Sequence, residues 1–160
     1  MMRPLVLLML LATPAQAQYP GWPPPQYSQA MLQAHNAVRA QVGVAPLVWS
    51  SQLAGVAQEW ADRLLATNSF AHRPSNRYGE NLYTISGGMA SPGDVIDAWV
   101  SEAQGYNFSR NTCSGVCGHY TQIVWRQTRA VGCAVASSGY RQIWVCNYDP
   151  PGNVIGFRPY

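Results

Sequence analysis

Lysine is absent from this chain, and charged residues of all kinds make up only 11% of its 160 residues. Its ten basic residues are all arginines, set against seven acids for a formal net charge of +3. A charge this small and scattered does not support binding to nucleic acid. We interpret the missing lysine as a compositional bias of the genome, of the kind found in bacteria. Nearly half of the residues are apolar, which suits one domain with a hydrophobic core.

Long hydrophobic runs are also absent, so the sequence predicts no transmembrane segment. The apolar run at residues 5–11 is short, and it follows Arg3 and precedes a small-x-small pattern (AQA) at residues 15–17. This arrangement predicts a secretion signal over residues 1–17, cleaved before Gln18. An uncleaved anchor is the alternative. We expect an exported protein, extracellular or in the periplasm if the source is bacterial.

Cysteine occurs only four times. In an exported chain we expect these cysteines to be paired in disulfides. The spacing Cys113-x3-Cys117 would instead suit a zinc site in a reducing compartment, which export argues against.

A β-hairpin is predicted from two β-like runs, residues 130–136 and 142–148. If the Gly-Tyr pair at residues 139–140 forms a two-residue turn, Cys133 faces Cys146 at a spacing that a disulfide can close. A shift of one residue in the turn would lose this register. We therefore predict the pairs Cys133–Cys146 and, locally, Cys113–Cys117.

Residues 18–27 (QYPGWPPPQY) form a proline-rich lead-in that we expect to exclude a helix. It is interpreted as a linker, with a ligand for a proline-binding domain as the alternative. From Ser28, apolar residues recur at helical spacing until Gly43. His35 lies on this apolar stripe, so we interpret it as a hydrogen-bonded core residue and not as a ligand.

Two further helices are predicted. A serine at position 50 or 51 caps the second, whose buried face comprises Leu53, Val56, Ala57, Trp60 and Leu64. The SPGD sequence at residues 91–94 begins the third with a capping residue, a proline and an acid. Along it Glu102 shares one face with Val95 and Trp99. Because an unpaired buried carboxylate is costly, we expect a partner opposite Glu102.

Ionisable side chains suited to a site are scarce, since the chain has only three histidines. His72 falls in a polar loop, Glu80 lies in YGENLY, and His119 directly precedes an apolar run in GHYTQIVWRQT at residues 118–128. Together with Glu102 they supply two imidazoles and two carboxylates, a set able to ligate a divalent metal or to transfer protons. Periodicity does not decide whether residues 121–125 are helical or extended.

Four stretches of the sequence together resemble the CAP superfamily, which comprises cysteine-rich secretory proteins, antigen 5 and plant pathogenesis-related proteins of the first group. They are HNAVR at 35–39, GENL at 79–82, GHYTQIVWRQT at 118–128 and CNYDPPGNV at 146–154. The third is the most specific, and the resemblance covers the chain from about residue 28 onward. It implies an α+β fold for residues 28–160, a three-layer α-β-α sandwich with a small central antiparallel sheet.

The resemblance also implies a central cleft lined by two histidines and two glutamates: His72, Glu80, Glu102 and His119. In family members the histidine pair can hold zinc or another divalent metal. A catalytic zinc usually has three protein ligands, so two histidines would bind it weakly, and we expect no obligatory cofactor. The same residues could serve a metal-dependent hydrolase of protease or esterase type, or form a network that only ties loops to the sheet. With no HExxH helix and no nucleophile tied to a base, binding is favoured over catalysis.

Members of the yeast and plant branches of the family bind sterols and fatty acids in a groove apart from that cleft. The resemblance therefore implies lipid binding, or an interaction module directed at a host or microbe. Tyr106 and Phe108 lie in the segment where the resemblance places the groove. The alternative is that these two aromatic rings are lids on the core. Expected partners are a lipid or sterol and, alternatively, an extracellular protein.

The last residues, PPGNVIGFRPY at 150–160, resemble a short defence peptide that plant relatives release by cleavage. Asp149 stands at the position of the cut. A precursor of such a peptide is thus a further alternative. We favour instead a tail that packs on the sheet through Val154, Ile155 and Phe157.

Overall fold

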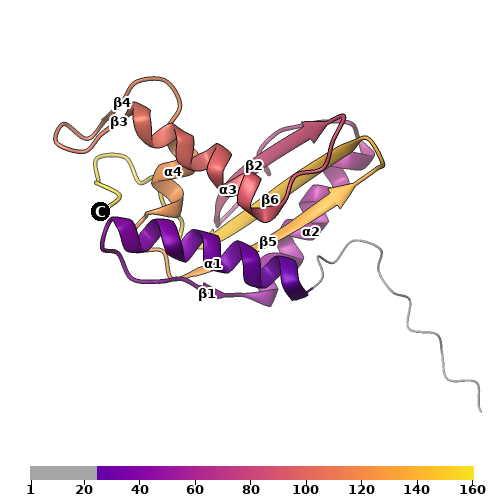
Figure 1. The fold of residues 1–160 in the computed structure, drawn as a ribbon, viewed down its shortest axis with the longest axis horizontal. Coiled ribbons are helices and arrows are strands. Elements are labelled where there is room, and N and C mark those ends of the chain that lie inside the picture. Colours follow the sequence, from indigo (N-terminus) through magenta and orange to yellow (C-terminus); the bar gives the residue numbers. More distant parts are fainter. Residues whose placement is uncertain (1–24) are drawn as a thin grey trace, which may run out of the picture.

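The computed structural model describes residues 25–160 (Figure 1). The expected signal at residues 1–17 and the lead-in up to residue 24 lie outside the described residues. Helix α1 (Pro25–Gln41) begins three residues before Ser28, so the expectation that the lead-in excludes a helix is wrong for its last three residues. Proline is tolerated at the first helical position because its missing N–H has no helical partner there.

Four strands form one sheet in the order β1-β5-β6-β2. Strands β2 (Gly79–Ser86) and β5 (Ala130–Ser137) both pair antiparallel with the central strand β6 (Arg141–Asp149). The two-residue edge strand β1 (Val48–Trp49) runs parallel to β5. The sheet is therefore antiparallel except at this edge, and β2 is the other edge strand.

Helices cover both faces of the sheet (Figure 1). Helix α2 (Ser51–Ala66) packs on one face, and helices α1, α3 (Pro92–Val100) and α4 (Gly118–Ile123) lie over the other. The three-layer α-β-α sandwich is thus confirmed. The segment 121–125, which periodicity left open, contributes the last turn of α4 and the residues directly after it.

A short 3-10 helix and a small hairpin extend from the end of α3. Helix η1 (Ser101–Gly105) follows α3 directly, and strands β3 (Tyr106–Asn107) and β4 (Thr112–Cys113) pair next. Glu102 therefore lies in the 3-10 turn and not in the helix proper. Figure 1 shows the hairpin reaching away from the sheet, on the side of the molecule where the C-terminus lies.

The sheet has a separate apolar core on each face, because side chains alternate along a strand. On the α2 side the buried residues include Trp60, Leu64 and Ile143. On the other side Trp99, Trp144 and Tyr148 lie in the larger core. Gly132 brings β5 against the start of α2 so closely that a Cβ there would lie 2.2 Å from the Ala54 nitrogen.

Both predicted disulfides are confirmed. Cys133 and Cys146 face each other in the β5–β6 hairpin in the predicted register, and Cys113 is joined to Cys117. The pairing is consistent with an oxidising compartment. Within residues 25–160 no helix is both long and apolar enough to cross a membrane.

Two buried polar residues of the HNAVR segment link α1 to the rest of the fold. The His35 ring contacts the Met31 carbonyl through Nδ1 (2.7 Å) and the Tyr148 hydroxyl through Nε2 (2.8 Å). A carbonyl only accepts, so Nδ1 carries the hydrogen and Nε2 accepts from Tyr148. Burial lowers the pKa of His35 to about 4. The interpretation of His35 as a hydrogen-bonded core residue is confirmed.

Arg39, one turn further along α1, is fully buried and donates to four backbone carbonyls. Its acceptors are the oxygens of Ala45 (2.7 Å), Ile123 (2.8 Å), Trp125 (2.9 Å) and Thr128 (3.2 Å). Burial, together with the charge of Arg129, lowers the pKa of Arg39 to about 10. The guanidinium donates hydrogen bonds to carbonyls at and beyond the C-terminus of α4. The C-terminus of a helix carries partial negative charge, so a cation is favoured there. Arg39 thereby fixes the helix that carries His119.

Candidate functional site

The first candidate pair joins the loop after α2 to strand β2. His72 Nδ1 lies 2.7 Å from Glu80 Oε1. The His72 side chain is 65% exposed, whereas that of Glu80 is only 4% exposed. The Arg73 backbone N–H also donates to Glu80 Oε1 (3.1 Å). The buried carboxylate therefore holds the exposed ring and the loop that carries it.

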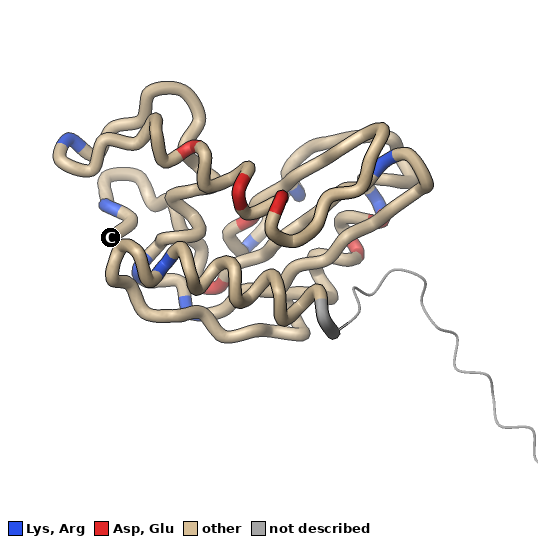
Figure 2. Tube along the Cα trace, viewed as in Figure 1, with Lys and Arg blue, Asp and Glu red and all other residues tan. Residues whose placement is uncertain are grey.

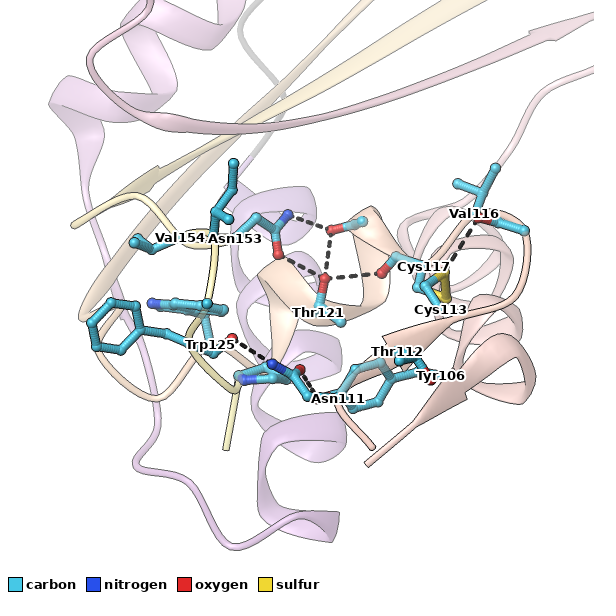
Figure 3. A pocket seen from close by; sticks show the side chains of 16 residues that line it. Tyr106, Asn111, Thr112, Cys113, Val116, Cys117, Thr121, Trp125, Asn153 and Val154 are labelled. Atoms are coloured by element: carbon cyan, nitrogen blue, oxygen red, sulfur yellow. Dashed lines mark hydrogen bonds between the residues drawn. A yellow bond between two sulfur atoms is a disulfide. The ribbon is translucent and has the colours of Figure 1, made fainter. Parts of the chain in front are cut away.

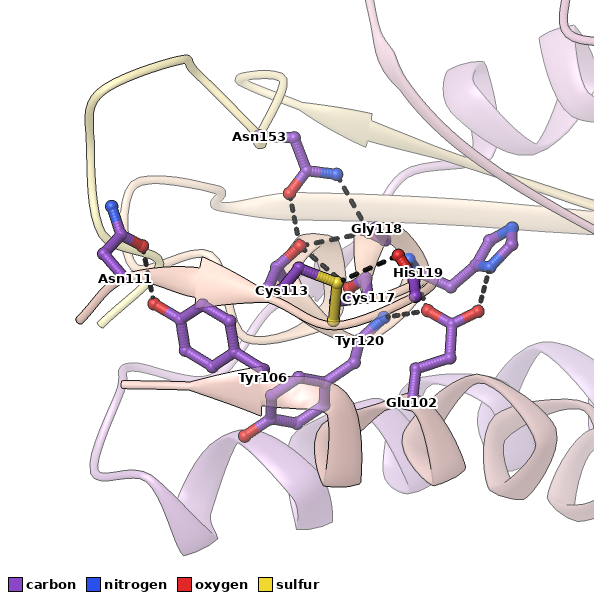
Figure 4. Close-up of a disulfide and its surroundings, with 11 residues drawn as sticks. Glu102, Tyr106, Asn111, Cys113, Cys117, Gly118, His119, Tyr120 and Asn153 are labelled. Atoms are coloured by element: carbon purple, nitrogen blue, oxygen red, sulfur yellow. Dashed lines mark hydrogen bonds and ion pairs between the residues drawn. A yellow bond between two sulfur atoms is a disulfide. The ribbon is translucent and has the colours of Figure 1, made fainter. Parts of the chain in front are cut away.

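The second pair joins η1 to α4 (Figure 4). Glu102 Oε1 lies 2.6 Å from His119 Nδ1, and its Oε2 accepts from the backbone N–H groups of His119 (2.9 Å) and Tyr120 (3.3 Å). The partner expected opposite Glu102 is thus His119. The His119 ring also stacks on Trp99, with ring centroids 5.9 Å apart. Contacts to a carboxylate and to an indole together fix the orientation of the imidazole.

Both pairs use the same ring nitrogen. An ionised carboxylate only accepts hydrogen bonds, so in each pair Nδ1 carries the hydrogen and Nε2 of the neutral ring has a free lone pair. Histidines that bind metals typically have this carboxylate contact on the nitrogen away from the metal. His72 and His119 are therefore oriented as metal ligands would be.

Edge strand β2 relates the two pairs. Glu80 and Asn81 are neighbours in this strand, so their side chains point to opposite sides of the sheet. Glu80 contacts His72, and Asn81 Nδ2 donates to the His119 carbonyl (3.0 Å). The pairs accordingly flank the same end of β2. Asn81 Nδ2 also donates to the Tyr148 hydroxyl (3.1 Å), which connects this end of the strand to the buried His35.

The donor atoms of the four expected cleft residues do not include three that lie mutually within 4.8 Å. Within residues 25–160, only His35, Cys133 and Cys146 form a set of at least three potential ligands with donor atoms mutually within 4.8 Å. Those two cysteines are joined in a disulfide, so they offer no thiolate. The geometry thus provides two oriented imidazoles, each on its own carboxylate, and not three converged ligands.

Two asparagines near Glu80 were missed in the sequence. Asn76 Nδ2 donates to Glu80 Oε2 (3.3 Å) and to Asn147 Oδ1 (3.2 Å). The Nδ2 atom of Asn147 is buried without a hydrogen-bond partner. Asn147 faces Glu80 across the β2–β6 ladder, so this unused donor lies beside the His72–Glu80 pair. In the sequence, the only indication that Asn147 belongs to the site was its place in the CNYDPPGNV stretch.

A separate cavity of about 510 Å³ lies between the disulfide loop, α4 and the C-terminal segment (Figure 3). Its wall is largely apolar and includes Tyr106, Val116, Trp125, Val154 and Phe157. The Cys113–Cys117 disulfide lies in the same wall. The Nε1 atom of the buried Trp125 has no hydrogen-bond partner. This nitrogen is itself buried, so the surface that the cavity offers is largely apolar.

The two aromatic residues expected in a lipid groove differ in position. Tyr106 lines the cavity, and its hydroxyl donates to Asn111 Oδ1 (2.8 Å). Burial, reinforced by Tyr160, raises the pKa of Tyr106. Phe108 is not part of the cavity wall and stacks on Tyr160, with centroids 4.8 Å apart. Of the two residues expected in a lipid groove, only Tyr106 lines the cavity.

The C-terminal segment does not pack as we expected. Val154, Ile155 and Phe157 are exposed, so the expectation that they pack on the sheet is wrong. The segment is held instead by polar contacts, such as Asn153 Nδ2 to the Gly118 carbonyl (2.8 Å) and the Arg126 N–H to the Pro159 carbonyl (2.6 Å). These bonds fix the backbone and leave the three apolar side chains on the outside.

The fold and the histidine–carboxylate pairs together define an α-β-α sandwich protein with a polar site at a sheet edge and an apolar cavity apart from it. Residues 32–148 match the model of the CAP family, described as the cysteine-rich secretory protein family. The chain is 48% identical over 135 residues to pathogenesis-related protein 1C of Nicotiana tabacum, covering 82% of this chain and 80% of the relative. It is 44% identical over 133 residues to pathogenesis-related protein 1 of Arabidopsis thaliana, covering 82% and 81%. The protein belongs to the CAP family.

Solved structures agree with this assignment. The venom allergen-like protein 4 of Schistosoma mansoni superimposes with a TM-score of 0.71 at 27% identity, over 86% of this chain and 95% of the other. The structure of NaASP2 with Zn²⁺ superimposes with a TM-score of 0.72 at 24% identity, over 86% of each chain. At that identity the second comparison supports the fold alone.

Proposed function

We propose that this CAP protein is an exported binding protein that holds a lipid of fatty-acid or sterol size in the 510 Å³ cavity. The observation that carries the proposal is the cavity itself, whose volume falls within the range of roughly 300–1,000 Å³ typical of small-molecule sites. Its largely apolar wall would bury hydrocarbon.

The two disulfides support export, because they persist in oxidising compartments. The printed names of the plant relatives, pathogenesis-related proteins, support a setting in which the protein meets a host or a microbe.

Calorimetric titration of palmitate and, separately, of ergosterol into the mature protein tests the proposal. Val116→Asp places a carboxylate in the cavity wall and is expected to weaken binding at least tenfold, or about 1.4 kcal/mol. Phe108→Ala, outside the wall, and His72→Ala, in the other site, should bind as the wild type does. Absence of heat with both lipids, or equal binding by Val116→Asp, would refute the assignment.

A second candidate function, divalent-metal binding, has its own observation. We propose that Nε2 of His72 and of His119 bind Zn²⁺, with Glu80 and Glu102 orienting the rings through Nδ1. The donor chemistry fits zinc, and two protein ligands predict weak, exchangeable binding. The related fold of NaASP2 has been observed with Zn²⁺.

Titration of zinc into the wild type, His119→Ala and Glu102→Gln tests the metal site. We expect loss of binding in His119→Ala and tenfold or greater weakening in Glu102→Gln, because the amide can present its donor to Nδ1 and disturb the ring. His35→Gln serves as the matched control, since this histidine is buried in the core. If the wild type and His119→Ala take up zinc equally, the histidine pair is not the site.

A further inference from the structure

Four exposed apolar side chains gather around the cavity, and we call them the mouth patch: Val116, Val154, Ile155 and Phe157. All four line the cavity, and all four are also open to solvent, Ile155 by 98% and Phe157 by 61%. Exposed apolar groups that cluster in this way mark surfaces that bind a partner or a membrane.

Three of the four mouth-patch residues, Val154, Ile155 and Phe157, lie on one defined turn, and Val116 lies in the loop closed by the Cys113–Cys117 disulfide. Asn153 and Gly156 both have positive φ angles, 58° and 87°, so the chain reverses sharply around residues 154 and 155. The Phe157 N–H donates to the Val154 carbonyl (3.1 Å) and closes the turn. On both sides the backbone is tied to α4 or to the residues directly after it. The apolar side chains therefore project from a fixed, protruding turn.

Arginines surround this patch. Arg126 and Arg158 line a second hollow of about 390 Å³, which shares Trp125, Gly156 and Phe157 with the cavity. Arg110 lies in the turn of the β3–β4 hairpin, where the Phe108 and Ser109 carbonyls accept hydrogen bonds from Arg158. Figure 2 shows basic residues at the end of the molecule where the C-terminus lies. In the part of the chain that the structure describes, the one arginine–carboxylate ion pair is Arg73–Glu59, so these three arginines are not neutralised by ion pairs.

Within residues 25–160, no Asp or Glu side chain forms an ion pair with Arg110, Arg126 or Arg158. Glu102 is already engaged by His119. The end of the molecule is thus apolar at its tip and cationic around it. Protruding apolar side chains ringed by arginines match the interface of an anionic bilayer, where the former enter the headgroup region and the latter meet phosphates.

We propose that the mouth patch docks this protein onto an anionic lipid bilayer, with Ile155 and Phe157 inserted at the interface and Arg110, Arg126 and Arg158 on lipid phosphates. A flat protein partner fits less well, because three of the four apolar residues stand on one narrow turn. This inference goes beyond the proposed lipid binding and stands without it. If both hold, the cavity faces the bilayer, and a ligand can pass between them without crossing water.

Co-sedimentation with vesicles tests the proposal. One set contains phosphatidylcholine alone, and the other contains equal parts of phosphatidylcholine and phosphatidylglycerol. We expect the mature protein to bind the anionic vesicles and to lose affinity as salt is raised. Ile155→Asp should weaken binding at least tenfold. Arg110→Gln combined with Arg126→Gln should weaken it by about 25-fold, at about fivefold for each arginine.

Matched controls lie elsewhere on the surface. Met89→Asp alters another exposed apolar residue, and Arg63→Gln removes an exposed arginine of α2; both should bind as the wild type does. Equal binding to the two kinds of vesicle, no binding to either, or full binding by Ile155→Asp overturns the proposal. Palmitate titration of the Arg110→Gln/Arg126→Gln variant separates the two ideas, because neither arginine lines the cavity. A variant that loses vesicle binding but still binds palmitate shows that the membrane surface is separate from the cavity. A variant that loses palmitate binding but still binds vesicles shows an effect on the cavity alone.

Discussion

The buried His35 predicts that acid destabilises this protein through one identifiable ring. Its pKa is about 4 in the fold, against an ordinary value of 6.5. Burial is the main cause, and the nearby Arg39 adds to it. Protonation at Nε2 would also place a donor against the Tyr148 hydroxyl, which already donates to this nitrogen and accepts from Asn81. The folded state therefore resists the proton that the unfolded chain accepts.

The sign and size of the effect follow from this difference. Between pH 6.5 and about 4 the unfolded chain binds a proton at His35 and the folded protein does not, so stability falls as the pH falls through this window. Above 6.5 the ring is neutral in both states and contributes no pH dependence. At about 1.4 kcal/mol for each unit of pKa difference, the full loss is about 3 kcal/mol. It levels off below about pH 4.

Urea unfolding with both disulfides intact, repeated at several pH values across this window, measures the effect. His35→Gln keeps a polar side chain that does not titrate, so the difference between wild type and variant isolates the ring from the carboxylates. As the pH falls from 6.5 to about 4, the free energy of unfolding of the wild type should fall by about 3 kcal/mol relative to that of His35→Gln. A difference curve that stays flat, or an NMR titration of the His35 ring centred near 6.5, would refute the reasoning.

Two further predictions concern packing. Arg39→Met removes the charged donor from the buried carbonyls that Arg39 binds, and we expect it to lower the free energy of unfolding by about 4 kcal/mol. Arg63→Met, at an exposed arginine, should change the free energy of unfolding by about 0.5 kcal/mol or less. Equal urea midpoints for these two variants would contradict the role of Arg39. Gly132→Ala should lower the free energy of unfolding by about 3 kcal/mol or more, because the new Cβ would meet the backbone at Ala54. Gly55→Ala has open space around it and should raise the free energy of unfolding by about 0.5–1 kcal/mol, as measured by thermal unfolding. A tolerated alanine at Gly132 would show that β5 and α2 can separate.

Features set by neighbouring residues could be predicted from the sequence. The cap of α3 depends on Ser91, Pro92 and Asp94, and all its hydrogen bonds form within four residues. The Cys133–Cys146 pairing depends on the turn between the two strands, which fixes the register over the whole hairpin. The partner of Glu102 was expected from the cost of burying a carboxylate, although only the fold shows that it is His119.

Features set by distant contacts could not be predicted. Val154, Ile155 and Phe157 have the composition of a buried segment, but their backbone is tied by bonds to residues far away in the sequence, such as Gly118. Likewise, the unused donor of Asn147 becomes meaningful only when the β2–β6 register puts it opposite Glu80. Hydrophobicity indicates how strongly the side chains of a segment tend to be buried. It does not show whether the hydrogen bonds of the backbone hold the segment in a position where they can be buried.

The way the C-terminal segment is attached has a consequence for how the protein can diversify. Its position depends on backbone groups and on the side chain of Asn153, whereas the side chains of Val154, Ile155 and Phe157 contribute little to the cores. Sequence change at these three positions therefore carries a low penalty for folding. A lineage can alter what this surface recognises by ordinary point mutation, while the sandwich and its histidine–carboxylate pairs stay as they are.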